Sequence, residues 1–327
     1  MRQSTNGHTA NERFPLHQNV AVAGTRMDVF HAPQPYAFTA NDIERIGYCL
    51  RLYASTHVLA LGTTGSRIAH ELVKKLLKEL GSNRLPAGFN YLMVDAAAPH
   101  PGMDQDHFHR LAGGLNGAGT DPKRGFDLFC TVETYEQLRF TLGSHVVDFG
   151  RSDPELPCCV PPREAVDFWI IGGCGGTSGG ALDPAIKLIH DVAQQRNIQH
   201  PRVNVLLIGA EISLGDRTRS VTTKQQQVVR ATAAGLVCKL AGDMANSQPI
   251  DETRPDGTSF SVSSSDRVWS LLLADQTNGQ ADCSTVDGLI RVVVEALFPR
   301  LFTMAGIHLG DRFKDFVELG STGRGQL

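Results

Sequence analysis

The sequence lacks the features that mark secreted, metal-binding and membrane-spanning proteins. Its seven cysteines form no CxxC pair, no zinc-ligand spacing and no even disulfide framework, which favours a reducing compartment. No apolar run approaches the ~18 residues of a membrane span. The polar N-terminus, MRQSTNGHTANERF, has no apolar signal-peptide core. We therefore predict a cytoplasmic globular protein without a membrane span.

The sequence also lacks a strong charge of either sign. Its 31 Lys and Arg residues nearly balance 34 Asp and Glu residues, for a net charge of −3. Without a broad basic surface, neither nucleic acid nor an anionic membrane is a favoured partner. Hydrophobic residues make up 41% of the 327 residues, which is enough for a sizeable core.

Glycine, by contrast, is concentrated in three segments. Six glycines lie between Gly172 and Gly180, and the other two segments are ALGTTGS (60–66) and GGLNGAGTDPKRG (113–125). Glycine lets backbone N–H groups approach a phosphate, and a helix that follows offers its positive end to the anion. A glycine turn that packs a strand against a helix is the structural alternative. Because the run from Gly172 to Gly180 has more glycine than such packing needs, we predict phosphate binding there.

Strand and helix patterns alternate along the chain. Such alternation predicts an α/β fold, a doubly wound, mostly parallel sheet with helices on both faces. Ligands of these sheets bind beyond the carboxyl ends of the strands. The predicted strands are 56–62, 89–95, 166–173, 202–212 and 267–275, and the predicted helices are 39–55, 67–81, 133–146, 183–197, 222–244 and 284–302.

Three boundaries complete this prediction. The helix over 183–197 should have Asp183 as its N-cap and Pro184 at its first position. Residues 1–20 are expected to form a loose arm, 152–163 an irregular insertion and 249–266 a polar loop. The predicted organisation is an N-terminal arm and helix over 1–50, a nucleotide-binding domain over 51–302 and a C-terminal tail over 303–327.

The segment ALGTTGS also fits a dinucleotide-binding site. It reads AxGxxG, one glycine short of the fingerprint, and Asp95 ends the next strand, where an acid could bind ribose. An NAD-dependent enzyme is therefore an alternative, although that fold uses one glycine loop for its phosphates. A P-loop is excluded because no glycine run is followed by Lys-Ser or Lys-Thr.

Taken together and in this order, the three segments resemble the nucleotide loops of the tubulin/FtsZ superfamily. GLNGAGTDPKRG is very similar to the bacterial FtsZ form, and GGTSGG over 175–180 resembles the tubulin signature GGTGxG. The Ser-Gly order departs from that signature, and Thr63-Thr64 stands where FtsZ has glycines. The resemblance runs from Val58 to Phe302 and fits the divergent bacterial tubulin-like group better than FtsZ itself.

The resemblance implies GTP or GDP with Mg²⁺ as the ligand, and no metal ligand from the protein. It also implies GTPase activity and filament formation, with copies of the chain or related subunits, in a complete form. Asp95 would lie near the nucleotide, Arg217 or Arg219 near ribose or phosphate, and Asp275, Gln276 and Asn278 near guanine. The implied phosphate-binding residues are Gly62, Thr63, Thr64, Gly65, Ser66, Ala118, Gly119, Thr120, Gly175, Gly176, Thr177, Ser178, Gly179 and Gly180.

In this superfamily an acidic loop of one subunit completes hydrolysis on the next, and a second domain follows it. RFKDFVELGSTG resembles that loop weakly, with Asp311, Asp315 and Glu318 as candidate catalytic acids. The tail after Phe302 has 25 residues (327 − 302), below the ~50 of a small domain. We therefore expect the start of a missing second domain, slow hydrolysis and no long filaments. A non-catalytic nucleotide-binding scaffold is the second alternative.

Overall fold

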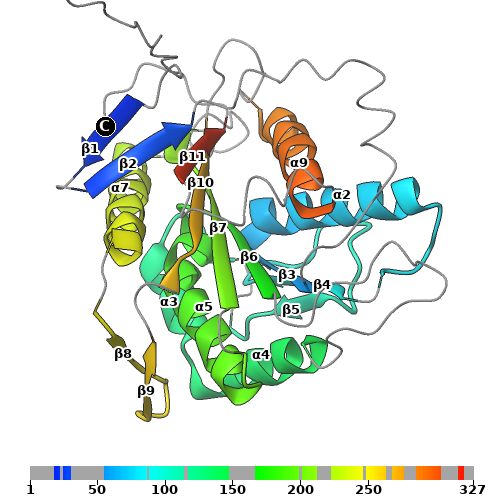
Figure 1. Cartoon of the computed structure of the whole chain (residues 1–327), viewed down its shortest axis with the longest axis horizontal. Helices are drawn as coiled ribbons and strands as arrows, with labels where there is room; N and C mark the ends of the chain where they lie inside the picture. Colours follow the sequence, from blue (N-terminus) through cyan, green and yellow to red (C-terminus); the bar gives the residue numbers. More distant parts are fainter. Residues whose placement is uncertain are drawn as a thin grey trace, which may run out of the picture.

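A nine-stranded sheet forms the middle layer of the molecule (Figure 1). The computed structural model describes residues 55–86, 88–113, 117–146, 166–198, 201–211, 222–245, 248–262, 267–275 and 285–302, and the backbone of 18–22, 25–30 and 316–319. The strands are β1 Gln18–Val22, β2 Thr25–Phe30, β3 Ser55–Leu61, β4 Phe89–Asp95, β5 Phe108–Arg110, β6 Val166–Gly173, β7 Pro201–Ile208, β10 Ser270–Ala274 and β11 Phe316–Leu319.

Helices cover both faces of this sheet, which confirms the predicted fold class (Figure 1). Alternate side chains of one strand enter the two cores: Leu59 and Leu61 face one helical layer, and Val58 and Ala60 face the other. The first layer contains α3 Pro122–Phe129, α4 Val132–His145, α5 Gly176–Gln195 and α7 Thr223–Ala245, and the second contains α2 Gly62–Leu80 and α9 Val286–Phe302.

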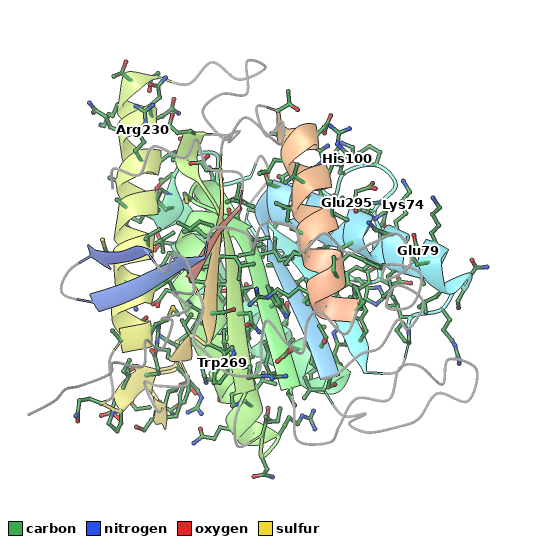
Figure 2. The ribbon with its side chains drawn as sticks, turned by 45° about the horizontal axis from the view of Figure 1, so that its top comes forward. Lys74, Glu79, His100, Arg230, Trp269 and Glu295 are labelled. Atoms are coloured by element: carbon green, nitrogen blue, oxygen red, sulfur yellow. The ribbon has the colours of Figure 1, made fainter. Side chains whose placement is uncertain are left out.

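The strand order reverses between β3 and β6. The order is β1-β2-β11-β10-β7-β6-β3-β4-β5, and every neighbouring pair except β1–β2 is parallel. Ligands of such sheets bind outside the carboxyl ends of the strands at this switch point. In Figure 2, Trp269 precedes β10 at the amino-terminal edge of the sheet, and Arg230 of α7 lies toward the opposite edge.

Two helices begin earlier than the sequence predicted. The GTTGS segment is the start of α2, and α5 begins at Gly176, so that Pro184 lies inside it. The prediction that Asp183 caps this helix is wrong, because Asp183 sits in its second turn and pairs with Arg267. Proline at this position lacks the N–H that would bond the carbonyl of Gly180. The helix therefore accepts one lost hydrogen bond in order to start at the glycines.

Short strands were also missed. Residues 249–266 contain an antiparallel hairpin of β8 (Ile250–Thr253) and β9 (Ser259–Val262) instead of only a polar loop. Strand β1 begins within residues 1–20, which were expected to form a loose arm, β2 follows in the N-terminal segment over 1–50, and β11 lies in the C-terminal tail. Elements of four to six residues are too short to show a clear period. The predicted helix over 39–55, apart from Ser55 in β3, and the insertion over 152–163 lie outside the described residues.

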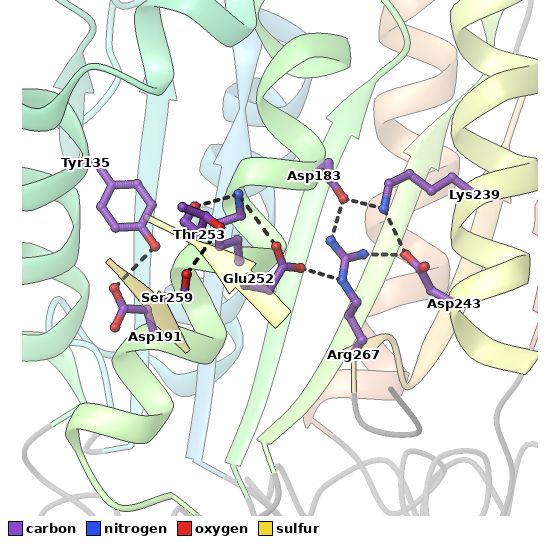
Figure 3. A network of polar contacts seen from close by, with 10 residues as sticks. Tyr135, Asp183, Asp191, Lys239, Asp243, Glu252, Thr253, Ser259 and Arg267 are labelled. Carbon is purple, nitrogen blue, oxygen red and sulfur yellow. Dashed lines mark hydrogen bonds and ion pairs between the residues drawn. The ribbon is translucent and has the colours of Figure 1, made fainter. Parts of the chain in front are cut away.

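A buried arginine joins this hairpin to α5 and α7 (Figure 3). Arg267 is 2% exposed, and its guanidinium donates to Glu252 of β8 at 2.9 Å, to Asp183 of α5 at 2.6 Å and to Asp243 of α7. Lys239 of α7 lies 2.8 Å from Asp183 and 3.3 Å from Asp243. Burial alone lowers the pKa of Arg267, but the three carboxylates outweigh it and the pKa is raised. The network therefore keeps a buried cation charged.

A second buried carboxylate anchors the far end of α5. Arg254, which follows β8, donates from Nε and Nη2 to the two oxygens of Asp191 at 2.9 and 2.8 Å. Tyr135 of α4 donates to the same carboxylate at 3.3 Å, and Asp191 is 1% exposed. The hairpin is thus fixed to α5 through Arg267 and Arg254, and Lys187 of α5 also donates to the backbone oxygen of Thr253 at 3.0 Å.

His57 makes the stability of the fold sensitive to acid. It lies in β3 at 3% exposure, with its ring stacked on Phe168 at a centroid distance of 5.4 Å. Burial, with a smaller effect from the charge of His145, lowers the pKa of His57 to about 3. Between pH 6.5 and 3 the unfolded chain therefore binds a proton that the folded chain does not, and stability falls as the pH falls.

We expect His57→Phe to flatten this acid dependence. The His57 contribution should amount to about 1.4 kcal/mol for each pH unit below 6.5. Urea unfolding of both proteins from pH 7 to pH 4 measures this contribution. As the pH falls, the unfolding free energy of the original protein should decrease faster than that of the variant. Parallel pH curves for the two proteins would show that His57 does not titrate differently on unfolding.

Candidate functional site

Helices α2 and α5 begin directly beyond the two strands at the switch point. Helix α2 starts at Gly62 after β3, and α5 starts at Gly176 shortly after β6. Both glycines have positive φ, +71° at Gly62 and +52° at Gly176, which is a conformation that favours glycine. Each is followed by a threonine, Thr63 in α2 and Thr177 in α5. The two helix starts are therefore built alike and lie on neighbouring strands.

Neither of these helix starts has a side-chain cap within the described part of the chain. The first four N–H groups of a helix have no partner inside it. The other four helices named above are capped by a side chain that accepts a hydrogen bond from a first-turn N–H group. The caps are Asp121 for α3, Thr131 for α4, Thr222 for α7 and Thr285 for α9. The starts of α2 and α5 instead have first-turn N–H groups without a side-chain cap, together with the positive ends of two helix dipoles.

The middle glycine segment packs against the start of α5. A Cβ added to Gly176 would lie 2.1 Å from the carbonyl oxygen of Gly119. Behind it, a Cβ on Gly125 would lie 2.3 Å from the carbonyl oxygen of Gly176, and one on Gly180 would lie 1.9 Å from that of Pro122. Backbone therefore touches backbone at three points. The sequence analysis did not single out Gly125, although its place in the first turn of α3, where glycine is a poor helix former, is a signal for such contact.

Helix α2 also approaches the sheet closely. A Cβ on Gly65 would lie 2.3 Å from the carbonyl oxygen of Ile171 in β6, and one on Gly62 would lie 3.1 Å from the hydroxyl of Ser178. Part of the glycine content thus serves packing, which was the structural alternative for these segments. Gly119 is different, because it is exposed, has a φ of +60° and leaves open space where a Cβ would stand.

Asp95 connects the two helix starts. It ends β4, is 4% exposed, and its two carboxylate oxygens accept separate hydrogen bonds. Thr63 donates to Oδ2 at 2.7 Å, and Thr177 donates to Oδ1 at 3.0 Å. The sequence predicted all three residues for one site, and the structure brings them together.

Each of the two helix starts also contains a buried serine, Ser66 in α2 and Ser178 in α5. Ser178 is 8% exposed and donates to the carbonyl oxygen of Gly175 at 3.1 Å. Ser66 is 1% exposed, and its hydroxyl has no hydrogen-bond partner among the described residues. Buried polar groups are normally paired, so Ser66 retains donor capacity at the base of the site.

Helix α7 forms a wall that the sequence analysis did not predict. A Cβ on Gly179 would lie 3.3 Å from Thr232, and one on Gly175 would lie 3.6 Å from Val229. Arg230 fixes this part of α7, because it donates to both oxygens of Glu211 after β7, at 2.6 and 2.9 Å. Val229 and Thr232 are three residues apart, a spacing that places both on one face of a helix. The sequence does not show which element that face contacts.

Asp275 lies at the same edge of the sheet, two strands from β6. A Cβ on Gly209 would lie 2.1 Å from its Oδ2, so the carboxylate covers the end of β7. Burial, with a smaller effect from Asp275, raises the pKa of Cys174 to about 12. The neutral thiol donates to the carbonyl oxygen of Ile208 at 3.0 Å. Cys174 is thus a packing residue in this structure.

The remaining predicted residues fall into two groups. Thr64 and Thr120 are half-buried and Ala118 is buried, all at the same edge as the helix starts. The backbone of Glu318 lies in β11, opposite Leu273 of β10, rather than in a loop. The predictions for Arg217, Arg219, Gln276, Asn278, Asp311 and Asp315 fall outside the described residues.

Comparison with solved structures finds α/β proteins of similar architecture. The chain is similar to CetZ2 from Haloferax volcanii in a GTPγS-bound protofilament, with 15% identity and a TM-score of 0.42 over 75% of this chain and 57% of that one. It is similar to Bacillus thuringiensis serovar israelensis TubZ in a GTPγS-form protofilament, with 15% identity and a TM-score of 0.45 over 78% and 58%. For Clostridium botulinum phage c-st TubZ the values are 9%, 0.40, 75% and 59%.

These three are tubulin/FtsZ-family structures. The chain spans less than three fifths of the length of each of them. The nucleotide analogue named for two of them belongs to those proteins. No protein-family profile and no curated protein matches the sequence.

Two searches of the described residues bear on ligands. No group of three or more His, Cys, Asp or Glu side chains gathers closely enough there to hold a metal ion. None of the helices in this part of the chain is both long and apolar enough to cross a membrane. The features that converge at the switch point are backbone N–H groups, hydroxyls and the carboxylate of Asp95, and the carboxylate of Asp275 lies two strands away.

Proposed function

We propose that the chain binds a guanine nucleotide, GTP or GDP, at the carboxyl ends of β3 and β6. One observation carries the proposal: two uncapped helices, each begun by a positive-φ glycine, start side by side where the strand order reverses. Two helix N-termini and a bare backbone form a site for more than one phosphate. A dinucleotide fold has the same strand order but uses one glycine loop for its pyrophosphate.

The phosphate end of the ligand is assigned to the helix starts. The N–H groups of α2 from Gly62 and of α5 from Gly176 would face the phosphates. Gly119, with open space in place of a Cβ, leaves room at the middle loop for the terminal phosphate. The resemblance of the three segments to tubulin/FtsZ nucleotide loops supports this order of contacts.

The base end is assigned to Asp275. Its carboxylate can accept hydrogen bonds from N1–H and the N2 amino group of guanine, a donor pair that adenine does not present. Its position over Gly209, on the far side of β7 from the phosphate site, separates the two ends of the ligand.

Mg²⁺ would be held mainly by the nucleotide. Magnesium is usually bound through one or two carboxylates together with substrate phosphates and waters. Asp95, the carboxylate between the two helix starts, already accepts a threonine hydroxyl at each oxygen, so the phosphates and waters would supply the ligands of the ion. In a complete form, GTP hydrolysis and self-association are further activities that the resemblance implies, with Asp311 or Asp315 as the acid, since Glu318 lies in β11.

Thermal unfolding tests the choice of ligand. We expect GTP and GDP with Mg²⁺ to raise the melting temperature more than ATP or NAD does. Binding to the folded state alone stabilises it by about 2.7 kcal/mol at a ligand concentration 100 times the Kd.

Asp275→Asn provides the control for base recognition. The amide has one acceptor oxygen where the carboxylate has two, and its NH2 group would face a guanine donor, so the shift with GTP should fall while any shift with ATP stays the same. A shift with NAD and none with guanine nucleotides would replace the proposal with the dinucleotide alternative.

A further inference from the structure

The two helix starts at the switch point are linked through one carboxylate on a third strand. Helix α2 continues from β3, α5 follows β6, and Asp95 ends β4, on the other side of β3 from β6. The Thr63–Asp95–Thr177 bridge therefore spans three neighbouring strands. Each carboxylate oxygen accepts one hydroxyl, at 2.7 and 3.0 Å, so both donors are engaged at once.

The surroundings of the bridge explain how a buried carboxylate is tolerated there. Asp95 is 4% exposed and forms no ion pair within the described residues. Hydroxyl donors and the positive ends of two helices stabilise a negative charge at this position. The two threonine hydroxyls therefore hold the carboxylate between the helix starts.

We propose that Asp95 is a positioning residue that fixes the starts of α2 and α5 relative to each other before the nucleotide binds. This inference rests on the proposed function. Ordering two loops at the moment of binding weakens affinity, whereas a site that is already ordered avoids that loss. The bridge transfers the ordering to the folded, ligand-free protein. Thr63 is exposed while Thr177 is 5% exposed, so the outer half of the bridge depends most on the hydrogen bond to Asp95.

The test removes the two hydroxyls separately and together. Thr63→Val and Thr177→Val keep the side-chain shape, and each should weaken GTP and GDP binding alike by about tenfold, the scale of one charge-assisted hydrogen bond. Because either change opens the bridge, the double variant should bind about as weakly as the single variants. Thr63→Ser and Thr177→Ser keep the hydroxyl and should bind within about twofold of the original protein.

Amide hydrogen exchange of the nucleotide-free protein is the second measurement. Residues 62–66 and 176–180 should exchange faster in each valine variant, including the segment that was not mutated, and at the original rate in the serine variants. Losses of affinity that multiply in the double variant, or unchanged exchange in the partner segment, would overturn the inference. If the unmodified protein binds neither GTP nor GDP, the proposed function fails, and the exchange data alone decide whether Asp95 links the two helices.

Discussion

Replacing Arg267 with methionine is expected to lower the free energy of unfolding by about 3–5 kcal/mol. The guanidinium is 2% exposed and donates to Asp183, Asp243 and Glu252. Methionine fills much of the space but leaves the carboxylates facing one another without the central cation. Removing one partner of a buried ionic network leaves uncompensated charge, which is why this loss exceeds that of a surface ion pair.

Chemical unfolding of the variant measures this loss, with Lys74→Met as the control. Lys74 lies on the outer side of α2, and its side chain is 69% exposed at 3.6 Å from Glu71 (Figure 2). Such exposed pairs contribute at most about 1 kcal/mol. Similar losses in the two variants would mean that the Arg267 network contributes no more than a surface pair.

Replacing Gly176 with alanine is expected to weaken guanine-nucleotide binding at least about 100-fold, since displaced phosphate donors each contribute on the order of 1–3 kcal/mol. The new Cβ would stand 2.1 Å from the carbonyl oxygen of Gly119, so the start of α5 and the middle segment must separate. The φ of +52° adds strain of about 1–2 kcal/mol for alanine. Both effects act on the backbone that is proposed to hold the phosphates.

Gly257→Ala separates strain from displacement. Gly257 has a φ of +87° in the turn of the β8–β9 hairpin, and a Cβ there meets no atom within 4 Å. This variant should lose a similar amount of stability through strain and keep its affinity for nucleotide. Isothermal titration with GDP compares the two proteins after their melting temperatures are known. Normal binding by Gly176→Ala would assign the glycine run to packing alone.

The buried strands could be predicted from the sequence because of their composition. FNYLMVD and VDFWIIGG coincide with β4 and β6 to the residue. Both are covered by helices on two faces, and strands buried on both sides are continuous apolar runs. The turn residues that follow the predicted strands are also local signals. The sequence therefore also predicted that the site lies at the carboxyl ends of these strands.

The helix starts and the Asp95 bridge required the structure. Glycine-rich segments are typical of loops, and neither Gly62 nor Gly176 signals that a helix begins there. Thr63 and Thr177 meet Asp95 only because β4, β3 and β6 are neighbours in the sheet. Strand order depends on packing between distant segments, which no local pattern contains. The same holds for Asp183, whose partner is Arg267 rather than its own helix.

Helix α5 connects two distant parts of the molecule. Its 20 residues, Gly176–Gln195, extend about 30 Å, and Asp191 in its last turns is tied by Arg254 to the β8–β9 hairpin. Gly125 and Gly180 bring the backbones of α3 and α5 into direct contact, so the two helices pack closely against each other. If a terminal phosphate binds as proposed and displaces Gly176, the displacement would be transmitted along the axis of α5 to the hairpin at its other end.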